Sequence, residues 1–151
     1  MLTTATQDWL TEHGFSVTDL DQPGRYQDTP IMLASRRGEV NIVQDLLAAG
    51  VNVNHRNQDG TNALWAAVVA NSFEIADLLL AHGADLDNQN DNGATALMYA
   101  ASSGKTPWVQ YFLARGANTT LRSLDDFSAL DLANNRDILR LLRQPSPVAA
   151  T

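Results

Sequence analysis

Apolar residues recur along the chain in sets that have the i, i+3, i+4 spacing of one helix face. Two clear sets, separated by a short polar break, are Leu64, Ala67 and Val68, and then Ile75, Leu78 and Leu79. The second set runs up to Gly83, and a glycine in this position commonly ends a helix. The pattern therefore predicts a short helix, a turn and a second helix.

This pair of helices returns every 33 residues. Leu64 recurs as Leu97 and again as Leu130, and the Leu-Leu-x-x-Gly ending at 46–50 recurs at 79–83. A fixed period in this range is typical of stacked repeats, in which each unit buries its apolar face against its neighbours. We therefore predict an all-α solenoid of stacked helix-turn-helix units.

The segments between the helix pairs, such as 54–60 and 87–93, are rich in Asn, Asp and Gly. These residues form turns through local side-chain hydrogen bonds or tolerate a positive φ. We expect each segment to form a projecting turn, called a finger below.

The repeating unit resembles the ankyrin repeat, which combines a turn, a Thr-Pro-Leu-His-x-Ala signature and a helix pair. The resemblance covers about residues 26–143 and is best over 90–101, which read NDNGATALMYAA. It implies an ankyrin-repeat solenoid with projecting β-turn fingers. It also implies a protein partner, bound along the concave face that the fingers and the first, inner helix of each pair form, and no cofactor.

The register divides the chain into a single ankyrin-repeat domain over residues 1–143, followed by a disordered tail at 144–151. The expected parts are an N-terminal half-repeat cap with an extended finger at 1–25, repeats at 26–56, 57–89 and 90–122, and a truncated C-terminal cap repeat with a shortened helix pair at 123–143. Terminal units depart from the period because one of their faces meets water. In the third repeat, Thr106 and Pro107 suit the N-cap and the first helical position.

The composition of the chain indicates the cellular compartment in which the protein works. The chain contains no cysteine, so it has neither a disulfide framework nor a thiolate zinc site, in keeping with a reducing compartment. Its first residues lack the basic start and apolar run of a secretory signal, and no apolar stretch is long enough to span a membrane. We expect a cytoplasmic protein that does not bind membranes.

The net charge of the chain limits the classes of partner that it can bind. The formal net charge is −7, and no Lys or Arg lies between Arg56 and Lys105. The phosphates of a nucleic acid would be repelled by this acidic middle, so we expect no nucleic-acid partner. The acidic residues themselves have two interpretations, a solvated surface that favours solubility or a patch that matches a basic partner.

Candidate chemistry is sparse. His13, His55 and His82 lie near the ends of different repeats, without the spacing of metal ligands. The carboxylate pairs Asp85/Asp87 and Asp125/Asp126 fall in fingers, where acids commonly form turns. No glycine loop follows a strand to cradle phosphates. We predict no enzyme, no metal site and no cofactor.

The register also selects candidate partner-binding residues. The positions before the turn between the helices are exposed in ankyrin repeats, and the finger tips and inner helices supply the rest. The candidates are Tyr26, Met32, Arg36, Arg37, Asp59, Trp65, Val69, Asp91, Met98, Tyr99 and Ser102. Arg36 and Arg37 would suit an acidic or carbonyl-rich group of the partner, whereas Val69 would suit an apolar group unless it is only a helix-compatible filler.

Three of these candidates replace the histidine of the family signature. Met32, Trp65 and Met98 occupy that position, with Asp131 in the last unit, so the usual imidazole hydrogen bonds are absent from every unit. Two interpretations remain open: the row adds packing between repeats, or it forms a partly exposed, adaptable binding strip.

The extended first finger has three more residues than its counterpart, comparing 14–29 with 50–62. Insertions in repeats commonly form loops on the binding side. Arg25 and Tyr26 would then contact the partner, although the finger could equally cover the exposed end of the first repeat.

These features predict a non-catalytic protein-binding module that is a monomer when free, and an adaptor, an inhibitor or immunity-type protein and an assembly factor all fit. The alternatives are a permanent structural subunit of a larger complex, which would expose a large apolar patch, and a small-molecule binder or enzyme, which would need a closed pocket with converging polar groups.

Overall fold

The computed structural model describes residues 1–144. The predicted tail at 144–151 therefore lies outside the described residues except for Gln144. Within them the chain forms α-helices and one 3₁₀ turn, with no strand, so the all-α prediction is confirmed. The elements are α1 (Thr4–Glu12), η1 (Arg25–Gln27), α2 (Pro30–Arg36), α3 (Val40–Ala48), α4 (Ala63–Val69), α5 (Phe73–Ala81), α6 (Ala96–Ser102), α7 (Thr106–Ala114) and α8 (Arg136–Arg143).

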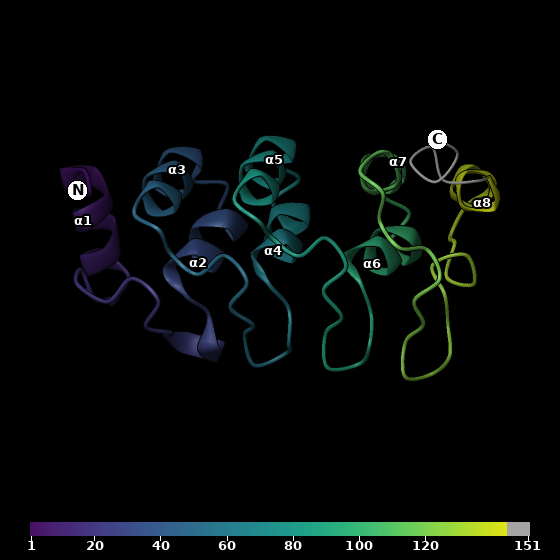
Figure 1. The fold of residues 1–151 in the computed structure, drawn as a ribbon, viewed down its shortest axis with the longest axis horizontal. Helices are drawn as coiled ribbons and strands as arrows, with labels where there is room; N and C mark the ends of the chain where they lie inside the picture. The colour runs from purple at the N-terminus through teal and green to yellow at the C-terminus, as the bar shows by residue number, and fades with distance from the viewer. Residues whose placement is uncertain (145–151) are drawn as a thin grey trace. The chain divides into compact units, whose positions relative to one another are not determined.

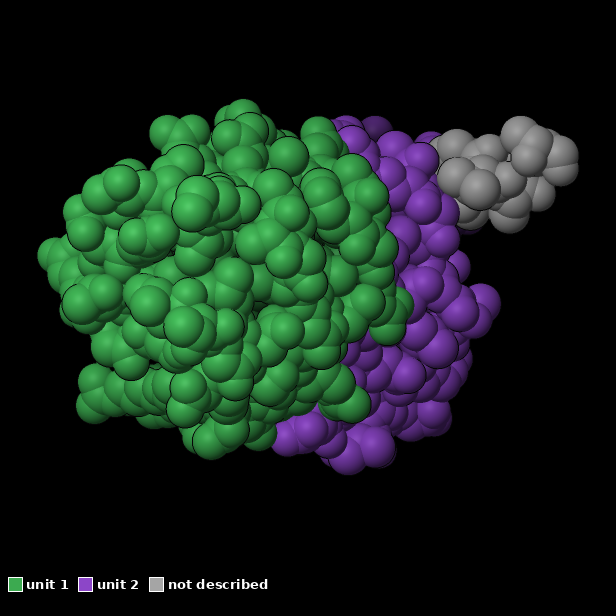
Figure 2. All heavy atoms as spheres, turned by 60° about the vertical axis from the view of Figure 1, so that its left-hand side comes forward, with its two compact units in different colours: residues 1–85 green, residues 86–151 purple. Residues whose placement is uncertain are grey.

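The chain divides into two compact units, Met1–Asp85 and Leu86–Thr151 (Figure 2). The division falls inside the segment 57–89 that the register assigns to the second repeat. The single domain over 1–143 and its repeat boundaries remain a prediction.

Unit 1 has two layers of helices, with α1, α3 and α5 in the outer layer and α2 and α4 in the inner layer (Figure 1). The outer helices pack against each other in chain order, and α2 packs against both α3 and α4. The core consists of apolar side chains from both layers: Leu10, Ile31, Met32, Val43, Leu46, Leu64, Ile75 and Leu79 are almost fully buried. The fingers project beyond the inner layer (Figure 1).

In unit 2 the inner helix α6 and the outer helix α7 pack together, and α8 packs on α7. The α7 face that holds them together is aromatic, with Trp108 and Phe112 buried and their ring centroids 5.8 Å apart. Met98 from α6 and Ile138 from α8 are also buried.

The last repeat differs from its prediction. A shortened helix pair is predicted, but residues 129–132 form turns, 133–135 are irregular and only the outer helix α8 is present. Too few residues separate Ser128 from the cap of α8 for an inner helix. Asn134 instead donates its backbone N–H to the Ala101 carbonyl at 3.1 Å and its side-chain amide to the Ser102 carbonyl at 2.8 Å. It thus satisfies carbonyl groups at the end of α6 that have no partner within that helix.

The predicted starts and ends of the helices follow from local chemistry. The side chains of Asn62, Thr95 and Asn135 accept N–H groups at the starts of α4, α6 and α8. The prediction for Thr106 is wrong by one residue, because α7 begins at Thr106 and its N-cap is Lys105. After α4 the chain turns through Asn71 with a φ of 56°, where the matching residues Gly38 and Gly104 have φ of 70° and 71°.

The fingers are tied together by hydrogen bonds that repeat with the period. Backbone N–H groups of Asn52 and Asn118 donate to the carboxylates of Asp21 and Asp87, both at 2.8 Å, within units 1 and 2 respectively. At the matching position in the next finger, the Asp85 N–H donates to the side-chain oxygen of Asn54 at 2.7 Å. Finger carboxylates and amides therefore hold neighbouring backbones in register.

Candidate partner-binding surface

The first finger, residues 15–28, has a different turn from the other fingers. The first and second fingers close their turns with the same backbone hydrogen bond: the Gly24 N–H donates to the Asp28 carbonyl, and the Asn57 N–H donates to the Thr61 carbonyl. Gly24 in the first finger therefore corresponds to Asn57 in the second. In the second finger, residues 51–61, the Asn57 side chain accepts two further N–H groups and stabilises the turn. Gly24 has no side chain that could do so.

Two successive residues of the first finger, Tyr26 and Gln27, lie in the left-handed region with φ of 59° and 62°. In the second finger the same turn needs only Gly60, with a φ of 79°. Each side chain held in this region costs about 1–2 kcal/mol, and such residues commonly cluster at functional sites. The turn holds the Tyr26 side chain 56% exposed.

The second finger holds this strained turn in place. The Gln58 N–H donates to the Tyr26 carbonyl at 3.0 Å, and Nε2 of His55 bonds to the Gln27 carbonyl at the same distance. Both carbonyls are thereby satisfied on the side of the neighbouring finger. The finger is therefore integrated into unit 1, and its exposed side chains are presented on a fixed backbone.

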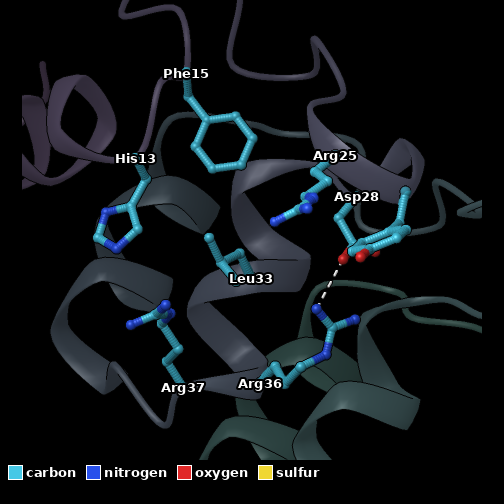
Figure 3. Close-up of a pocket in the computed structure, with 8 residues that line it drawn as sticks. His13, Phe15, Arg25, Asp28, Leu33, Arg36 and Arg37 are labelled. Atoms are coloured by element: carbon cyan, nitrogen blue, oxygen red, sulfur yellow. Dashed lines mark hydrogen bonds and ion pairs between the residues drawn. The ribbon is translucent and has the colours of Figure 1, made fainter.

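Beside this turn is a hollow of about 310 Å³, called the arginine pocket below (Figure 3). It is formed by the end of α1, the first finger and the α2 face. Its lining residues are His13, Phe15, Arg25, Tyr26, Asp28, Leu33, Arg36 and Arg37. Figure 3 shows Leu33 between the side chains of Phe15, Arg25 and Arg37, with His13 on the side of Leu33 opposite Arg25.

One wall of the pocket is aromatic. The ring of Phe15 stacks on buried Trp9 with centroids 6.0 Å apart, and the His13 ring lies 4.4 Å from the same indole. Nδ1 of His13 must donate to the Trp9 carbonyl, at 2.8 Å, so Nε2 is the ring nitrogen left for other contacts. A Cβ on Gly24 would lie 3.0 Å from the Phe15 ring, so the absent side chain lets the ring pack against the finger.

The opposite wall is a polar network. Asp28, whose side chain is 8% exposed, accepts Nη1 of Arg36 at 2.7 Å through Oδ2 (Figure 3). Its Oδ1 accepts the side-chain amide of Asn57 at 3.0 Å. One carboxylate thus fixes the first finger to α2 and to the second finger.

The other two arginines of the pocket remain exposed. Among the described residues, neither Arg25 nor Arg37 forms an ion pair, and the Arg25 guanidinium lies 5.3 Å from the centroid of the Tyr26 ring. Residues 1–85 contain four arginines, no lysine and eleven acidic side chains. Three of those four arginines line this pocket, and Asp28 is its one acidic lining residue. The pocket is therefore positively charged, whereas the rest of unit 1 is negatively charged.

The structure separates the predicted site residues into exposed and buried groups. In unit 1, Tyr26, Arg37, Asp59 and Val69 are exposed, and Arg36 and Trp65 are half-buried. In unit 2, Asp91 and Ser102 are exposed and Tyr99 is half-buried. Met32 and Met98 are 1% and 2% exposed, so a partner cannot reach them in this conformation. For these two methionines the packing interpretation applies, and the exposed strip does not form.

At the family's histidine position, side chains other than imidazole form hydrogen bonds in two units. Sδ of Met32 accepts the Thr29 N–H at 3.5 Å. A carboxylate oxygen of Asp131 accepts the Ser128 N–H at 2.9 Å and its hydroxyl at 3.1 Å. The hydrogen bond from the Ser128 N–H is the largest cause of a lowered pKa of Asp131, and the bond from the Ser128 hydroxyl and the charge of Arg122 at 3.5 Å lower it further. Sulfur and carboxylate acceptors therefore replace the imidazole there.

Sequence reasoning missed four pocket residues: His13, Phe15, Asp28 and Leu33. Two of them break the period visibly. Phe15 directly follows the glycine after an outer helix, a position that later repeats fill with Val51, Ala84 and Ala117. Asp28 directly precedes an inner-helix cap, a position that later repeats fill with Thr61, Ala94 and Phe127. A charged or bulky residue at a position that is otherwise small or neutral is the signal that could have identified them.

The described residues offer little other chemistry. In residues 1–144, no group of three or more His, Asp or Glu side chains is placed to hold a metal ion. In the same part of the chain, no helix has the length and apolar character needed to cross a membrane.

Two family models match the chain. A model for ankyrin repeats in three copies matches residues 5–90, and a model for ankyrin repeats in many copies matches residues 79–133. The first covers more than half of the chain, so this protein belongs to the ankyrin repeat family. No curated protein matches it. Ankyrin repeats are generally protein–protein interaction modules and are typically non-catalytic.

Proposed function

We propose that this chain is a non-catalytic module that binds a protein partner through its fingers and inner helices, with the arginine pocket as the main contact of unit 1. The observation that carries the proposal is the strained turn at Tyr26 and Gln27. Its cost is compensated by hydrogen bonds to the second finger, yet the Tyr26 ring that it presents is exposed. A ring held in this way is ready to contact a partner with little loss of conformational entropy.

Other side chains of the same unit extend this surface. Val69 at the end of α4 is 55% exposed, and the indole of Trp65 lies half-buried one turn earlier. In unit 2, Ser102 has the position in the repeat that Val69 has in unit 1, and Tyr99 on α6 and Asp91 in the finger before it are the other candidates. Aromatic and arginine side chains commonly supply most of the binding energy of an interface.

The pocket volume favours a protein side chain over a small molecule. At about 310 Å³ the pocket is at the lower end of the range for ligand sites, and exposed arginines form much of its wall. It has room for one or two side chains of a partner. An adaptor, an inhibitor or immunity-type protein and an assembly factor would each use the surface in this way.

The test is affinity capture from the lysate of the native organism, read by mass spectrometry. We compare wild type with a Tyr26→Ala, Arg37→Glu variant, which changes two exposed side chains and leaves the Asp28 network intact. The matched control is Asn41→Ala, Gln44→Ala, which changes exposed residues on the outer helix α3. The proposal expects one protein captured by wild type and by the control but lost from the pocket variant. Equal capture by all three would contradict it.

A second candidate, a permanent subunit of a larger assembly, is favoured by apolar side chains near the end of unit 2. Leu124, Phe127 and Leu130 are 77%, 47% and 36% exposed. Leu130 has the position of Leu64 and Leu97, both of which are buried. Sedimentation of the purified chain separates the candidates, because a well-behaved monomer that still captures its partner argues against the permanent subunit.

A further inference from the structure

We infer that the arginine pocket receives the side-chain carboxylate of an aspartate or glutamate in the partner, with a neighbouring apolar side chain of the partner lying on Leu33 and Phe15. This inference rests on the proposed function and specifies the chemistry of the partner.

The pocket has a positive charge in an otherwise acidic unit. The pocket gathers Arg25, Arg36 and Arg37 around the single carboxylate of Asp28, in a unit with eleven acidic side chains and four arginines. Charges more than about 8 Å apart are largely screened at physiological ionic strength, so a group inside the pocket interacts mainly with its lining. That lining carries a surplus of two positive charges when His13 is neutral.

Only one of the three arginines of the pocket forms an ion pair within residues 1–144. Asp28 already engages Nη1 of Arg36 and is 8% exposed, so it holds that arginine in position and does not reach outward. Arg25 and Arg37 lie on either side of Leu33 and form no ion pair within residues 1–144 (Figure 3). Two guanidinium groups on either side of one point are suited to a carboxylate, because each offers several N–H donors in a planar fork.

Between the arginines the pocket is lined by the apolar side chains of Leu33 and Phe15. Leu33 is half-buried at the centre of the arginines, and the Phe15 ring beside it is fixed by Trp9 and Gly24. A strongly hydrated ion such as free phosphate gains nothing from this apolar surface. An acidic side chain that follows or precedes a leucine-like residue would satisfy the arginines and bury apolar area together.

The test uses synthetic peptides and the full chain labelled with nitrogen-15. The acetylated, amidated peptide Leu-Asp-Gly is the probe, and Leu-Asn-Gly, with the same ends, is its neutral match. Titrations follow the side-chain N–H signals of Arg25 and Arg37 and the backbone signals of Leu33 and Tyr26. We expect saturable shifts with the aspartyl peptide, with a dissociation constant on the order of 1 mM, and none with the asparaginyl peptide.

Variants show whether the pocket is responsible. Arg37→Gln and, separately, Arg25→Gln should each weaken the aspartyl peptide about tenfold, which corresponds to ~1.4 kcal/mol. Arg143→Gln, an exposed arginine of α8, is the matched control and should bind as wild type does. Both pocket arginines are exposed, so these variants should fold.

Two further probes identify the source of the anion. Inorganic phosphate and acetyl-Gly-Leu with a free terminal carboxylate are titrated in the same way. Saturable shifts with either of these but none with the aspartyl peptide would overturn the inference, as would equal binding of the aspartyl and asparaginyl peptides. If the aspartyl peptide fails while the Tyr26→Ala, Arg37→Glu variant still loses its captured partner, the carboxylate inference is wrong and the proposed function stands. If the aspartyl peptide binds but the Tyr26→Ala, Arg37→Glu variant captures the same proteins as wild type does, the proposed function is contradicted instead.

Discussion

Replacement of Asp28 by alanine should destabilise the chain by about 2 kcal/mol. The Asp28 side chain is 8% exposed, and it accepts Arg36 at 2.7 Å and Asn57 at 3.0 Å. The Arg36 side chain is 37% exposed and can regain water, so its lost ion pair costs about 1 kcal/mol. The half-buried Asn57 amide loses an acceptor, which costs about 1 kcal/mol more.

Urea denaturation followed by circular dichroism measures this loss directly. A loss of this size also lowers the melting temperature by roughly 4–8 °C in a chain of about this length. Asp59→Ala is the matched control, because Asp59 is an exposed acid in the neighbouring finger, and it should change the free energy of unfolding by less than about 0.5 kcal/mol.

A double-mutant cycle with Arg36→Ala then isolates the ion pair. We expect the two substitutions to be less than additive by about 1 kcal/mol, since the second removes a group that the first has already left unpaired. A loss below about 0.5 kcal/mol for Asp28→Ala, or strict additivity in the cycle, would refute the role of Asp28 as the residue that fixes the first finger.

Three further predictions concern separate parts of the structure. Gln27→Gly should raise the free energy of unfolding by up to about 1 kcal/mol in urea denaturation, because glycine relieves the strain of a φ of 62°, and a loss of stability would contradict the strained turn. Hydrogen bonds from the Thr6 side chain and from Thr3 lower the pKa of Asp45 from 3.8, so the folded state binds this proton less readily than the unfolded state. The stability that the ionised Asp45 contributes is therefore complete above the ordinary carboxyl pKa and is lost as the pH falls through the lowered pKa. The Asp45→Asn variant should lose less stability than wild type between pH 7 and about pH 3. Parallel pH profiles of the two proteins would refute the assignment. Asn134→Ala should cost about 0.5–1.5 kcal/mol in thermal denaturation, because the Ser102 carbonyl loses its 2.8 Å partner, while Asn92→Ala, at an exposed asparagine, should leave the melting temperature unchanged.

The sequence predicted the helices well because the determinants are local. Apolar spacing, the N-caps at Asn62 and Thr95 and the glycines after α1, α3, α5 and α7 need only neighbouring residues to act. The start of α7 was wrong by one residue, because Lys105 takes the N-cap position without a side-chain hydrogen bond. The sequence showed that the last repeat is short, but it did not show that the inner helix is lost and that Asn134 then bonds the carbonyls at the end of α6, about 32 residues away.

The candidate site was predicted only in part because its residues come from three elements. Arg36, Arg37 and Tyr26 could be found from the register and the insertion. Phe15 packs against Trp9 and Gly24, and Asp28 bonds Arg36 and Asn57. These contacts follow no helical or repeat spacing, so only the departure of Phe15 and Asp28 from the period marks them. For Met32 the sequence left packing and binding both open, because a thioether can either pack in a core or bind at a surface and only its burial distinguishes the two.

The most direct test of the proposed binding surface is photo-crosslinking in living cells. Benzoylphenylalanine replaces Tyr26, whose ring is 56% exposed, and in a matched strain it replaces Gln44 on the outer face of α3. We predict a discrete protein adduct from position 26 and none from position 44. An adduct from position 44 alone, or none from position 26, would contradict binding of a protein partner at the arginine pocket.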